Sequence, residues 1–370
     1  MKKMLIFMGF CLAIGLGFVS CSKTTTSSDV PTTVVGTAGS YQGAGSRWSA
    51  TFTTTNFIIE KFPDATSTSA DNTVNGTYVQ YSSGFRKLTV TSATGTGAPV
   101  AGDQAYGFEV PGFAFFLKPI GSNNSEPIIM VNAGSCPSGT GFDANWIIAK
   151  FDSGTILNDT KDTFGKAVFN MTTPATSTAT IDKLSAETAA PLGTNAINFD
   201  YTTCANGKLT FPAGGGETVD MFFTQNGGAL VHSSNGTTHN NIIFAAPKHT
   251  AAVTQSDLAA TYSGLVFDGS SGGDKIFPVK ITMPSTGNGA ANKITDVETD
   301  ALGVETFPIG NFAVHALSNG LFTLALSPAT ENGRMSCTYF VISSIKVMAC
   351  NGYGSAAGTH EPFFLLARSR

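Results

Sequence analysis

The chain has 370 residues, of which 12% are charged, and its 25 acidic residues outnumber its 21 basic ones to give a net charge of −4. Because it has no run of basic residues, such a chain is not expected to bind nucleic acid. Its remaining polarity comes from Thr, Ser, Asn and Gly, which is typical of exported β-proteins, and its length allows two or three domains.

An export signal is predicted at the N-terminus. Lys2 and Lys3 precede an apolar segment, residues 4–19, which ends at the small residue Ser20. A basic start, an apolar segment and a small residue at its end are the parts of a signal peptide, and this segment is short for a membrane-spanning helix. We therefore predict a signal peptide at residues 1–20.

The last residues of this segment, FVSC at 18–21, resemble the lipobox of bacterial lipoproteins. The resemblance covers only the signal, and Phe18 and Val19 depart from the usual Leu and Ala or Ser. It implies that Cys21 becomes the lipidated first residue, with palmitate among its chains, so that lipid anchors the protein to a membrane. Ser22, in place of Asp, implies transport to the outer membrane of the bacterial cell envelope. An ordinary signal peptide cleaved nearby is the alternative.

Residues 21–38 are predicted to be the lipidated Cys and a flexible tether. The sequence SKTTTSSDVPTTVVGTA, which follows Cys21, lacks the apolar side chains whose burial would offset the entropy of ordering. A flexible segment of this length spans about 20–25 Å on average. We expect it to lift the folded body off the membrane surface.

The body contains an internal repeat. A Thr-His pair, two further residues and an apolar run occur twice, starting at Thr238 and at Thr359. Matched blocks precede both copies in the same order, and a fainter third copy begins at residue 39 and closes with NWIIAKF. Such a pattern indicates duplication of one structural unit. The matched blocks are 221–236 with 338–352, 205–211 with 318–324 and 162–169 with 260–267, and the predicted β units are 39–153, 158–249 and 255–370.

The predicted fold class is all-β, with three tandem antiparallel β-meander units, small barrels or sandwiches, packed together after a disordered tether. Runs rich in Phe, Val, Ile and Thr alternate with turn residues, and short connections favour antiparallel neighbours. One helical turn is expected near residue 256, capped by Ser256 or Asp257. The strands expected in the third unit are 262–267, 276–283, 292–299, 304–308, 312–317, 320–326, 335–342, 345–350 and 361–368.

The last strand of the third unit, within PFFLLA at 362–367, is apolar on both faces, whereas a half-exposed strand would alternate. A strand of this kind is covered on both faces. We therefore expect the last strand of each unit to contact a neighbouring unit as well as the core of its own.

A hairpin in the third unit predicts a disulfide. A two-residue turn at 343–344 places Ile342 opposite Ile345, and counting outward then places Cys337 opposite Cys350. By alternation these two form a non-hydrogen-bonded pair, where side chains are closest. In the second unit, the hairpin signal Asn-Gly at 226–227 aligns with this turn.

Two more cysteines, Cys136 and Cys204, then pair by elimination, because Cys11 leaves with the signal and Cys21 takes lipid. An even number of remaining cysteines in an exported chain indicates disulfides. Two free buried thiols are the alternative to this second bond.

Four residues are weak candidates for ligand binding. His239 and His360 lie just before the last strand of units two and three, which suggests a repeated contact at the rim of each barrel. Polar residues at a strand entrance are the alternative. Trp48 and Trp146 suggest a surface that stacks on sugars, and the alternative is that they are core residues.

Metal and catalytic signals are weak. Asp268 and Asp274 in DGSSGGD offer two carboxylates for calcium, but the EF-hand pattern is missing and a plain hairpin loop is the alternative. The zinc-hydrolase pattern His-Glu-x-x-His is not completed after His360, because Pro362 follows Glu361. We predict no metal site, no cofactor and no catalytic residues.

The prediction for function is a lipid-anchored envelope protein that is not an enzyme and has a binding, adhesion or scaffolding role. Its expected partners are the membrane, through the anchor, and a glycan or an envelope protein. One alternative is an exported hydrolase that acts on an envelope or extracellular polymer through an unrecognised site. The other is a purely structural envelope protein.

Overall fold

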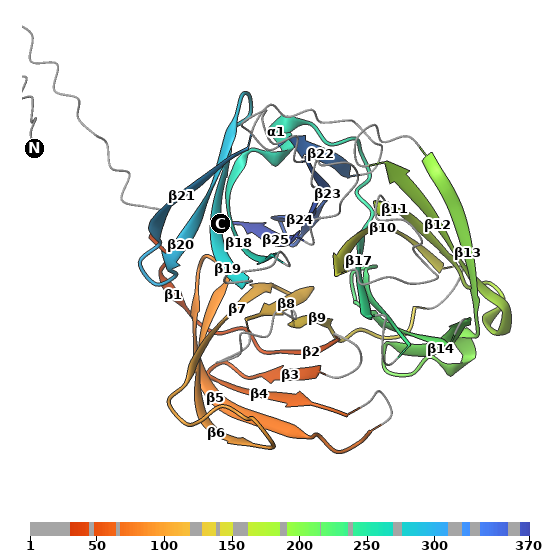
Figure 1. Cartoon of the computed structure of the whole chain (residues 1–370), viewed down its shortest axis with the longest axis horizontal. Helices are drawn as coiled ribbons and strands as arrows, with labels where there is room; N and C mark the ends of the chain where they lie inside the picture. The colour runs from red at the N-terminus through yellow and green to blue at the C-terminus, as the bar shows by residue number, and fades with distance from the viewer. Residues whose placement is uncertain are drawn as a thin grey trace, which may run out of the picture. The chain divides into compact units, whose positions relative to one another are not determined.

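The computed structural model describes residues 30–43, 48–63, 67–118, 128–137, 141–150, 162–185, 191–214, 216–235, 240–268, 276–309, 320–325, 334–353 and 363–370. Nearly all of its regular structure is β, arranged in three antiparallel sheets, so the predicted all-β class is confirmed (Figure 1). Within the described residues, no helix is long and apolar enough to cross a membrane.

The first sheet is a closed barrel. Eight strands, β2 to β9, each pair with the next, and β9 returns to pair with β2 through Asn132 and Tyr41. A short strand, β1, adds to β5 outside this ring. The strands are β1 (Thr33–Val34), β2 (Gly39–Gly43), β3 (Trp48–Phe52), β4 (Asn56–Lys61), β5 (Asn72–Tyr81), β6 (Phe85–Thr94), β7 (Gln104–Val110), β8 (Ala114–Leu117) and β9 (Ile128–Asn132).

The second sheet repeats this meander but is open. Its first and last strands pair through Ile147 and Phe244, whereas its fourth and fifth strands, β13 and β14, are not hydrogen-bonded to each other. The strands are β10 (Gly141–Lys150), β11 (Asp162–Asn170), β12 (Ser177–Ser185), β13 (Pro191–Phe199), β14 (Lys208–Gly214), β15 (Glu217–Phe223), β16 (Ala229–Ser234) and β17 (Asn240–Pro247), with 3₁₀ turns η1 (Pro174–Thr176) and η2 (Tyr201–Thr203).

The third sheet has the topology of the second. Its first and last strands pair through Leu265 and Leu366, and among the described residues β21 and β22 share no pairing. The expected strand at 312–317 lies outside the described residues. The elements are α1 (Gln255–Leu258), β18 (Ala260–Asp268), β19 (Ile276–Met283), β20 (Gly289–Asp296), β21 (Ala301–Ile309), β22 (Leu321–Ala325), β23 (Arg334–Ile342), β24 (Ile345–Tyr353) and β25 (Phe363–Ser369).

One matched block and one predicted unit boundary are wrong. The segment NWIIAKF, expected to close the first unit, lies mostly in β10, which pairs with β11 and β17 and is therefore the first strand of the second sheet. Consequently residues 162–169 form a second strand, whereas their supposed counterpart, 260–267, forms a first strand. Residues 146–149 of β10 are all apolar and buried, like those of a last strand, so sequence pattern alone did not distinguish this first strand from a last one.

The predicted flexible tether is wrong for its last part, residues 31–38, which we call the strap. Pro31 is buried, Thr33 in β1 pairs with Tyr81 in β5, and the backbone N–H of Thr37 donates to Gln80 Oε1 at 2.8 Å. The side chains of Val34 and Val35 in the strap stay exposed, but backbone hydrogen bonds along the edge of β5 hold it. Residues 21–29 lie outside the described residues.

Each barrel encloses its own hydrophobic core, and a further cluster of buried residues lies between the three sheets. Along β25, Leu365 and Ala367 face the core of the third barrel, whereas Phe364 and Leu366 face the shared cluster. The last strands of the other two sheets, β9 and β17, divide in the same way. The predicted double contact of each last strand is therefore confirmed.

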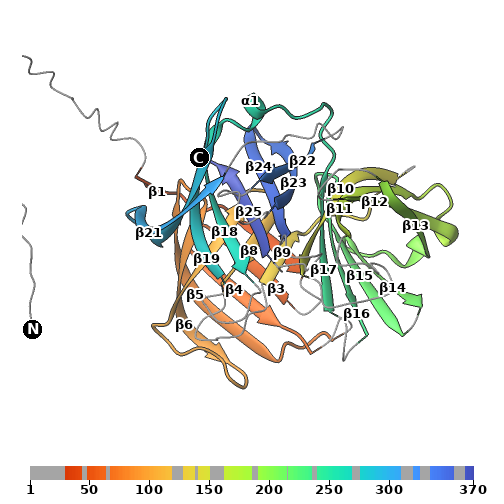
Figure 2. The same ribbon diagram turned by 45° about the horizontal axis from the view of Figure 1, so that its top comes forward.

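Aromatic side chains, Phe113 among them, link the three sheets within this shared cluster. Phe113, in the connection between β7 and β8, is fully buried. Its ring centre lies 5.3 Å from that of Phe244 in β17 and 4.9 Å from that of Phe340 in β23. The three meanders therefore pack around common side chains. Figure 2 shows the ribbons of the three sheets.

Both predicted disulfides are present. Ser343 and Ser344 have φ values of 48° and 69°, as a tight two-residue hairpin turn requires, and Cys337 pairs with Cys350 at a Cα distance of 4.1 Å. Cys136 is bonded to Cys204. The aligned hairpin of the second sheet is longer than expected, because Phe223 pairs with Ala229 and residues 224–228 form the loop.

The expected helical turn is present, but its predicted cap is wrong. Thr254 caps α1 by accepting a hydrogen bond from the backbone N–H of Asp257, and the Asp257 carboxylate accepts one from the backbone N–H of Thr254. This reciprocal pair is a capping box, which satisfies two backbone donors at once. Hydrogen bonds from Thr254 lower the pKa of Asp257.

Candidate functional site

The second barrel contains an apolar cavity. Twelve side chains line it, at least one from each of the eight strands, and all of them are hydrophobic. The cavity volume open to the centre of a water-sized sphere is about 30 Å³, and all the space between the lining side chains, counted out to solvent, is about 490 Å³. The lining residues are Trp146, Ala167, Phe169, Ala179, Ile181, Ile197, Phe211, Val219, Met221, Val231, Ile243 and Ala245.

Strand alternation places these side chains inside the barrel. In β11, Ala167 and Phe169 are buried and face the cavity, while Val168 between them is 43% exposed on the outer face. Small residues leave space among large ones, because Ala167, Ala179 and Ala245 lie in the same lining as Trp146. The cavity is thus a narrow gap in a core that side chains otherwise fill.

The cavity lies beside the open side of the barrel. Ile197 in β13 and Phe211 in β14 both line it, and these are the two neighbouring strands that share no backbone ladder. The rings of Phe199 and Phe211 stack across this break with their centres 5.3 Å apart. Side chains rather than backbone hydrogen bonds therefore close the barrel here.

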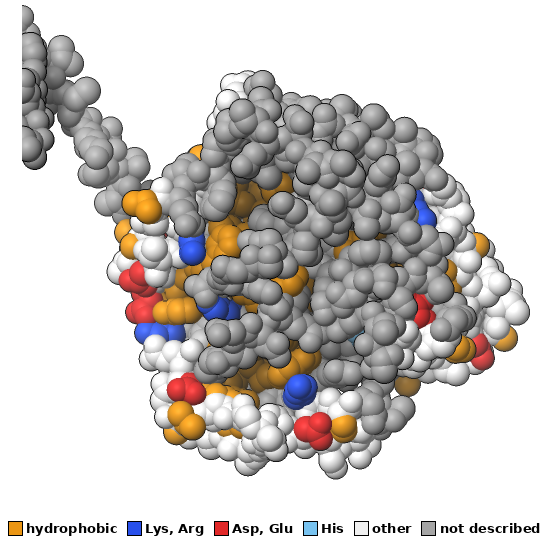
Figure 3. Space-filling model, in the orientation of Figure 1, with side chains coloured by type: hydrophobic (Ala, Val, Ile, Leu, Met, Phe, Trp, Pro, Cys, Tyr) orange, Lys and Arg blue, Asp and Glu red, His pale blue; other side chains and the backbone are white. Residues whose placement is uncertain are grey.

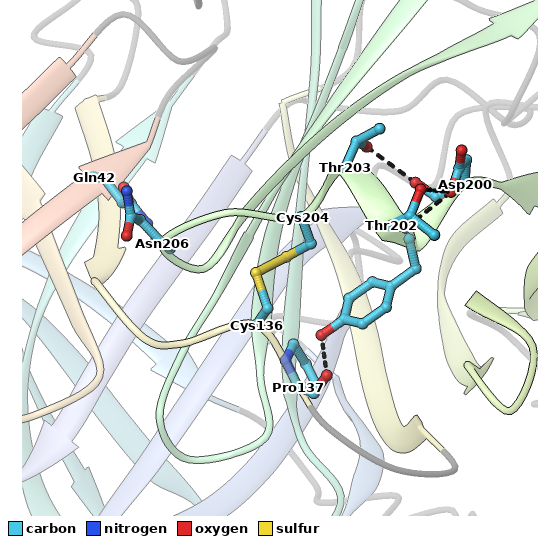
Figure 4. Close-up of a disulfide and its surroundings, with 9 residues drawn as sticks. Gln42, Cys136, Pro137, Asp200, Thr202, Thr203, Cys204 and Asn206 are labelled. Carbon is cyan, nitrogen blue, oxygen red and sulfur yellow. Dashed lines mark hydrogen bonds between the residues drawn. A yellow bond between two sulfur atoms is a disulfide. The ribbon is translucent and has the colours of Figure 1, made fainter. Parts of the chain in front are cut away.

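A disulfide holds one end of the break. Figure 4 shows Cys204, in the connection between β13 and β14, bonded to Cys136 in the segment that follows β9. Beside it, Tyr201 donates its hydroxyl proton to the carbonyl of Pro137, and burial raises the pKa of Tyr201. The hydroxyl and the backbone N–H of Thr202 donate to the Asp200 carboxylate and lower its pKa.

The cavity carries no charge, because none of its lining side chains is ionisable. The one polar atom of Trp146, Nε1, donates to the backbone carbonyl of Asp182 at 3.1 Å. Trp146 is therefore held in place with its hydrogen bond satisfied, and it presents its ring to the cavity. Such a lining can bind hydrocarbon but offers no partner to a charged group.

The structure separates the two predicted tryptophans. Trp146 is a buried core residue of the second barrel, so it is not part of an exposed sugar-stacking surface. Trp48 lies in β3 of the first barrel, half-buried, with Lys61 Nζ 5.7 Å from the centre of its ring. The alternative interpretation of Trp146, as a core residue, is therefore the correct one.

The other predicted site residues are mostly outside the described residues. This applies to Cys21, His239, His360 and Asp274, while Asp268 is the last residue of β18 and its side chain is not described. Within the described ranges, no group of three or more His, Cys, Asp or Glu residues is placed to hold a metal ion.

Two features bear on the enzyme alternative. His232 Nδ1 lies 4.0 Å from Asp220 Oδ2, and both side chains are buried. Neither lines the cavity. The sequence GSSGG at 269–273 matches the Gly-x-Ser-x-Gly pattern, but it lies outside the described residues.

Charged side chains do not gather on the described part of the face drawn in Figure 3. Lys and Arg lie interspersed with Asp and Glu there. A patch of one sign, which attracts oppositely charged polymers over a distance, is not seen among the described side chains of this face.

Comparisons with known proteins identify no family. No protein-family model and no curated protein matches the chain. Among solved structures, transferrin binding protein B from serogroup B Neisseria meningitidis is 10% identical over 87% of this chain, with a TM-score of 0.18, and this chain spans 64% of its length. The WD40 domain of SCAP from fission yeast is 8% identical over 92% of this chain and 86% of its own, with a TM-score of 0.14. At these scores neither likeness carries an argument about function.

Proposed function

We propose that this protein is a non-catalytic binding protein, lipid-anchored in the cell envelope, whose second barrel takes up a small apolar ligand. One observation carries the binding role: a wholly apolar cavity is lined by side chains from both β13 and β14, the two strands that share no backbone ladder in the described part of that barrel. The lipobox-like FVSC segment supports the anchor. The outer-membrane location, and a glycan or envelope protein as a further partner, stay predictions from the sequence.

The cavity suits a thin, uncharged chain. Its lining has no hydrogen-bonding partner for a polar head, and its enclosed part is narrow. Each methylene that moves from water into such a lining contributes about 0.8 kcal/mol. Six methylenes then contribute roughly 5 kcal/mol before the cost of association, so binding of a short alkyl chain is expected in the millimolar range.

The open side provides a route into the barrel. Separating β13 from β14 breaks no ladder hydrogen bond between them, and the side chains that must move there are Phe199 and Phe211. The disulfide at Cys204 restrains only the end of this break nearest to it. We therefore expect the cavity to widen at this side as a ligand enters.

Trp146 provides a direct test, because it lines the cavity and only one other Trp is present. The chain from Ser22 onward, carrying Trp48→Phe, is titrated with linear alkanols of six to ten carbons while the fluorescence of Trp146 is recorded. We expect saturable changes and a dissociation constant that falls about fourfold with each added methylene. Fluorescence that responds without saturation, or without dependence on chain length, would argue against the proposal.

Matched variants on one strand locate the binding. Ala167→Leu fills the cavity and should weaken alkanol binding at least tenfold, whereas Val168→Leu adds its bulk on the outer face of β11 and should leave binding unchanged. Thermal unfolding of both variants checks that they are folded. Equal binding by the two variants would place the alkanol outside the cavity.

A further inference from the structure

The first barrel contains a buried ion pair at the end where β5 turns into β6. Arg86 Nη2 lies 2.7 Å from Glu109 Oε1, and both side chains are inaccessible to solvent. The carboxylate is saturated with donors, because the Tyr41 hydroxyl also donates to Oε1 at 2.6 Å and Gln80 Nε2 donates to Oε2 at 2.8 Å. The interior of this barrel is therefore polar at one end, unlike the apolar interior of the second barrel.

A second arginine reaches the same turn from the third barrel. Arg368 in β25 donates from Nη2 to the backbone carbonyl of Ser82 at 2.6 Å and is 8% exposed. Gly84 leaves room for this side chain, because a Cβ at that position would lie 2.6 Å from Arg368 Nε, and its φ of +97° favours glycine. Arg368 thus contacts the turn at residues 82–84 from the third barrel, and Arg86 follows this turn in β6.

Four buried donors around this turn have no hydrogen-bond partner among the described residues. They are Arg86 Nε, Arg86 Nη1, Arg368 Nε and the hydroxyl of Ser83, which is 1% exposed. The rings of Phe52 and Tyr78 lie against the face of the Arg86 guanidinium, with their centres 4.2 and 4.8 Å from Cζ. Arg86 Nη2 also donates to the carbonyl of Thr37 at 2.9 Å, so Nε and Nη1 carry the N–H groups of this guanidinium that are left for a further partner.

The charges around the turn do not balance. Arg side chains keep their proton in proteins, so Arg86 and Arg368 contribute two positive charges against the one carboxylate of Glu109. Burial lowers the pKa of Arg368, and of its charged neighbours Glu109 raises that pKa while Arg86 lowers it. The two arginines therefore repel each other across the turn, and a buried excess cation is costly unless an anion pairs with it.

We propose that the turn at residues 82–84, with Arg86 and Arg368, is a binding site for a small monovalent anion, a halide or a carboxylate. The unpartnered N–H groups and the Ser83 hydroxyl supply its donors, and the excess positive charge supplies the attraction. This site lies apart from the apolar cavity of the second barrel and does not depend on the function proposed for that cavity.

The anion has a structural consequence, because the same turn joins three parts of the body. The backbone N–H of Ser82 donates to the carbonyl of Thr32 in the strap at 2.8 Å, and the Ser82 hydroxyl accepts from the N–H of Thr32. The Ser82 carbonyl accepts from Arg368 of the third barrel. An anion here relieves repulsion at the junction of strap, first barrel and third barrel, so it should stabilise the folded chain.

Thermal unfolding in different sodium salts at one ionic strength tests the site. Chloride, bromide and formate are compared with gluconate, whose anion is too large for an enclosed turn. If the small anion is present at ten times its dissociation constant, the unfolding midpoint should rise by about 2 °C over that in gluconate. Chloride and formate acting alike indicates a general anion site, and a rise with only one of them identifies a halide or a carboxylate site.

Three variants keep this test decisive. Ser83→Ala removes one donor without removing charge. It should raise about tenfold the anion concentration at which half of the midpoint shift is reached. Arg368→Met should abolish the difference between salts, whereas Arg370→Met, two residues along and paired with Asp300, should keep it. A bromide-soaked crystal should show anomalous density beside Arg86 and Arg368. Equal midpoints in all four salts, or ordered water alone at the turn, would overturn the proposal.

Discussion

Replacing Phe113 by Ala should destabilise the three barrels together. This side chain is fully buried and packs against Phe244 of the second sheet and Phe340 of the third. Removing a buried Phe ring costs about 3–5 kcal/mol, through lost transfer free energy and the cavity that remains. Because the ring is shared, we expect the whole cost to fall on one cooperative transition.

Differential scanning calorimetry measures this effect. The entropy of unfolding is about 2.1 cal/mol/K per residue, so the unfolding entropy of the body from Pro31 to Arg370 is about 0.7 kcal/mol/K. The loss of 3–5 kcal/mol therefore corresponds to a midpoint about 4–7 °C lower. Phe62→Ala is the matched control, since Phe62 is half-buried in the same barrel and belongs to none of the four buried clusters.

Two results would refute this reasoning. A midpoint shift for Phe113→Ala no larger than that for Phe62→Ala would show that the shared ring does little. Separate unfolding transitions in the unmodified protein would show that the cluster between the sheets does not couple the barrels.

Three further predictions concern the two disulfides, Asp300 and Cys21. Replacing both cysteines of the Cys136–Cys204 bond by Ser should lower the free energy of unfolding in urea by about 4 kcal/mol, against about 3 kcal/mol for Cys337–Cys350, because the first bond closes a loop of 68 residues and the second a loop of 13. Equal losses would contradict this. Burial raises the pKa of Asp300, but hydrogen bonds from Arg370 and Lys280 lower it overall, so the stability that Asp300 contributes is present above its unfolded pKa and is lost as the pH falls through its lower folded pKa. Asp300→Asn should therefore narrow the difference between the unfolding midpoints at pH 7 and pH 3, and an unchanged difference would contradict this. In a bacterial host, Cys21→Ala should abolish incorporation of labelled palmitate and release the protein from membranes, and labelling that persists would rule out lipidation of Cys21.

Much of the fold was predictable because its signals are local. The all-β meander follows from short apolar runs between turn residues, and the Cys337–Cys350 bond follows from one hairpin turn, since strand pairing counts outward from the turn. The double contact of β25 was predictable for the same kind of reason. A strand without polar residues on either face must be covered on both.

The candidate sites were not predictable in this way. The cavity is formed by side chains from eight strands and borders the break between β13 and β14. The sequences of these two strands do not indicate that they stay unpaired with each other. The polar composition of residues 21–38 predicted disorder, but the strap is ordered by strand pairing with β5 and by a hydrogen bond to the buried Gln80 side chain. Trp146 was a weak candidate for a sugar-stacking surface, whereas its neighbours in the folded chain bury it in a core.

The sequence by itself determined the strands, the tight hairpin turn, one disulfide and the repetition of one meander, because those depend on residues close together in the chain. Only the tertiary structure decided which strand begins the second barrel, where that barrel stays open, and that Arg368 of the third barrel contacts the turn at Ser82 in the first. Those features depend on which surfaces pack together over separations of up to 286 residues, as between Ser82 and Arg368, and no local pattern records that choice.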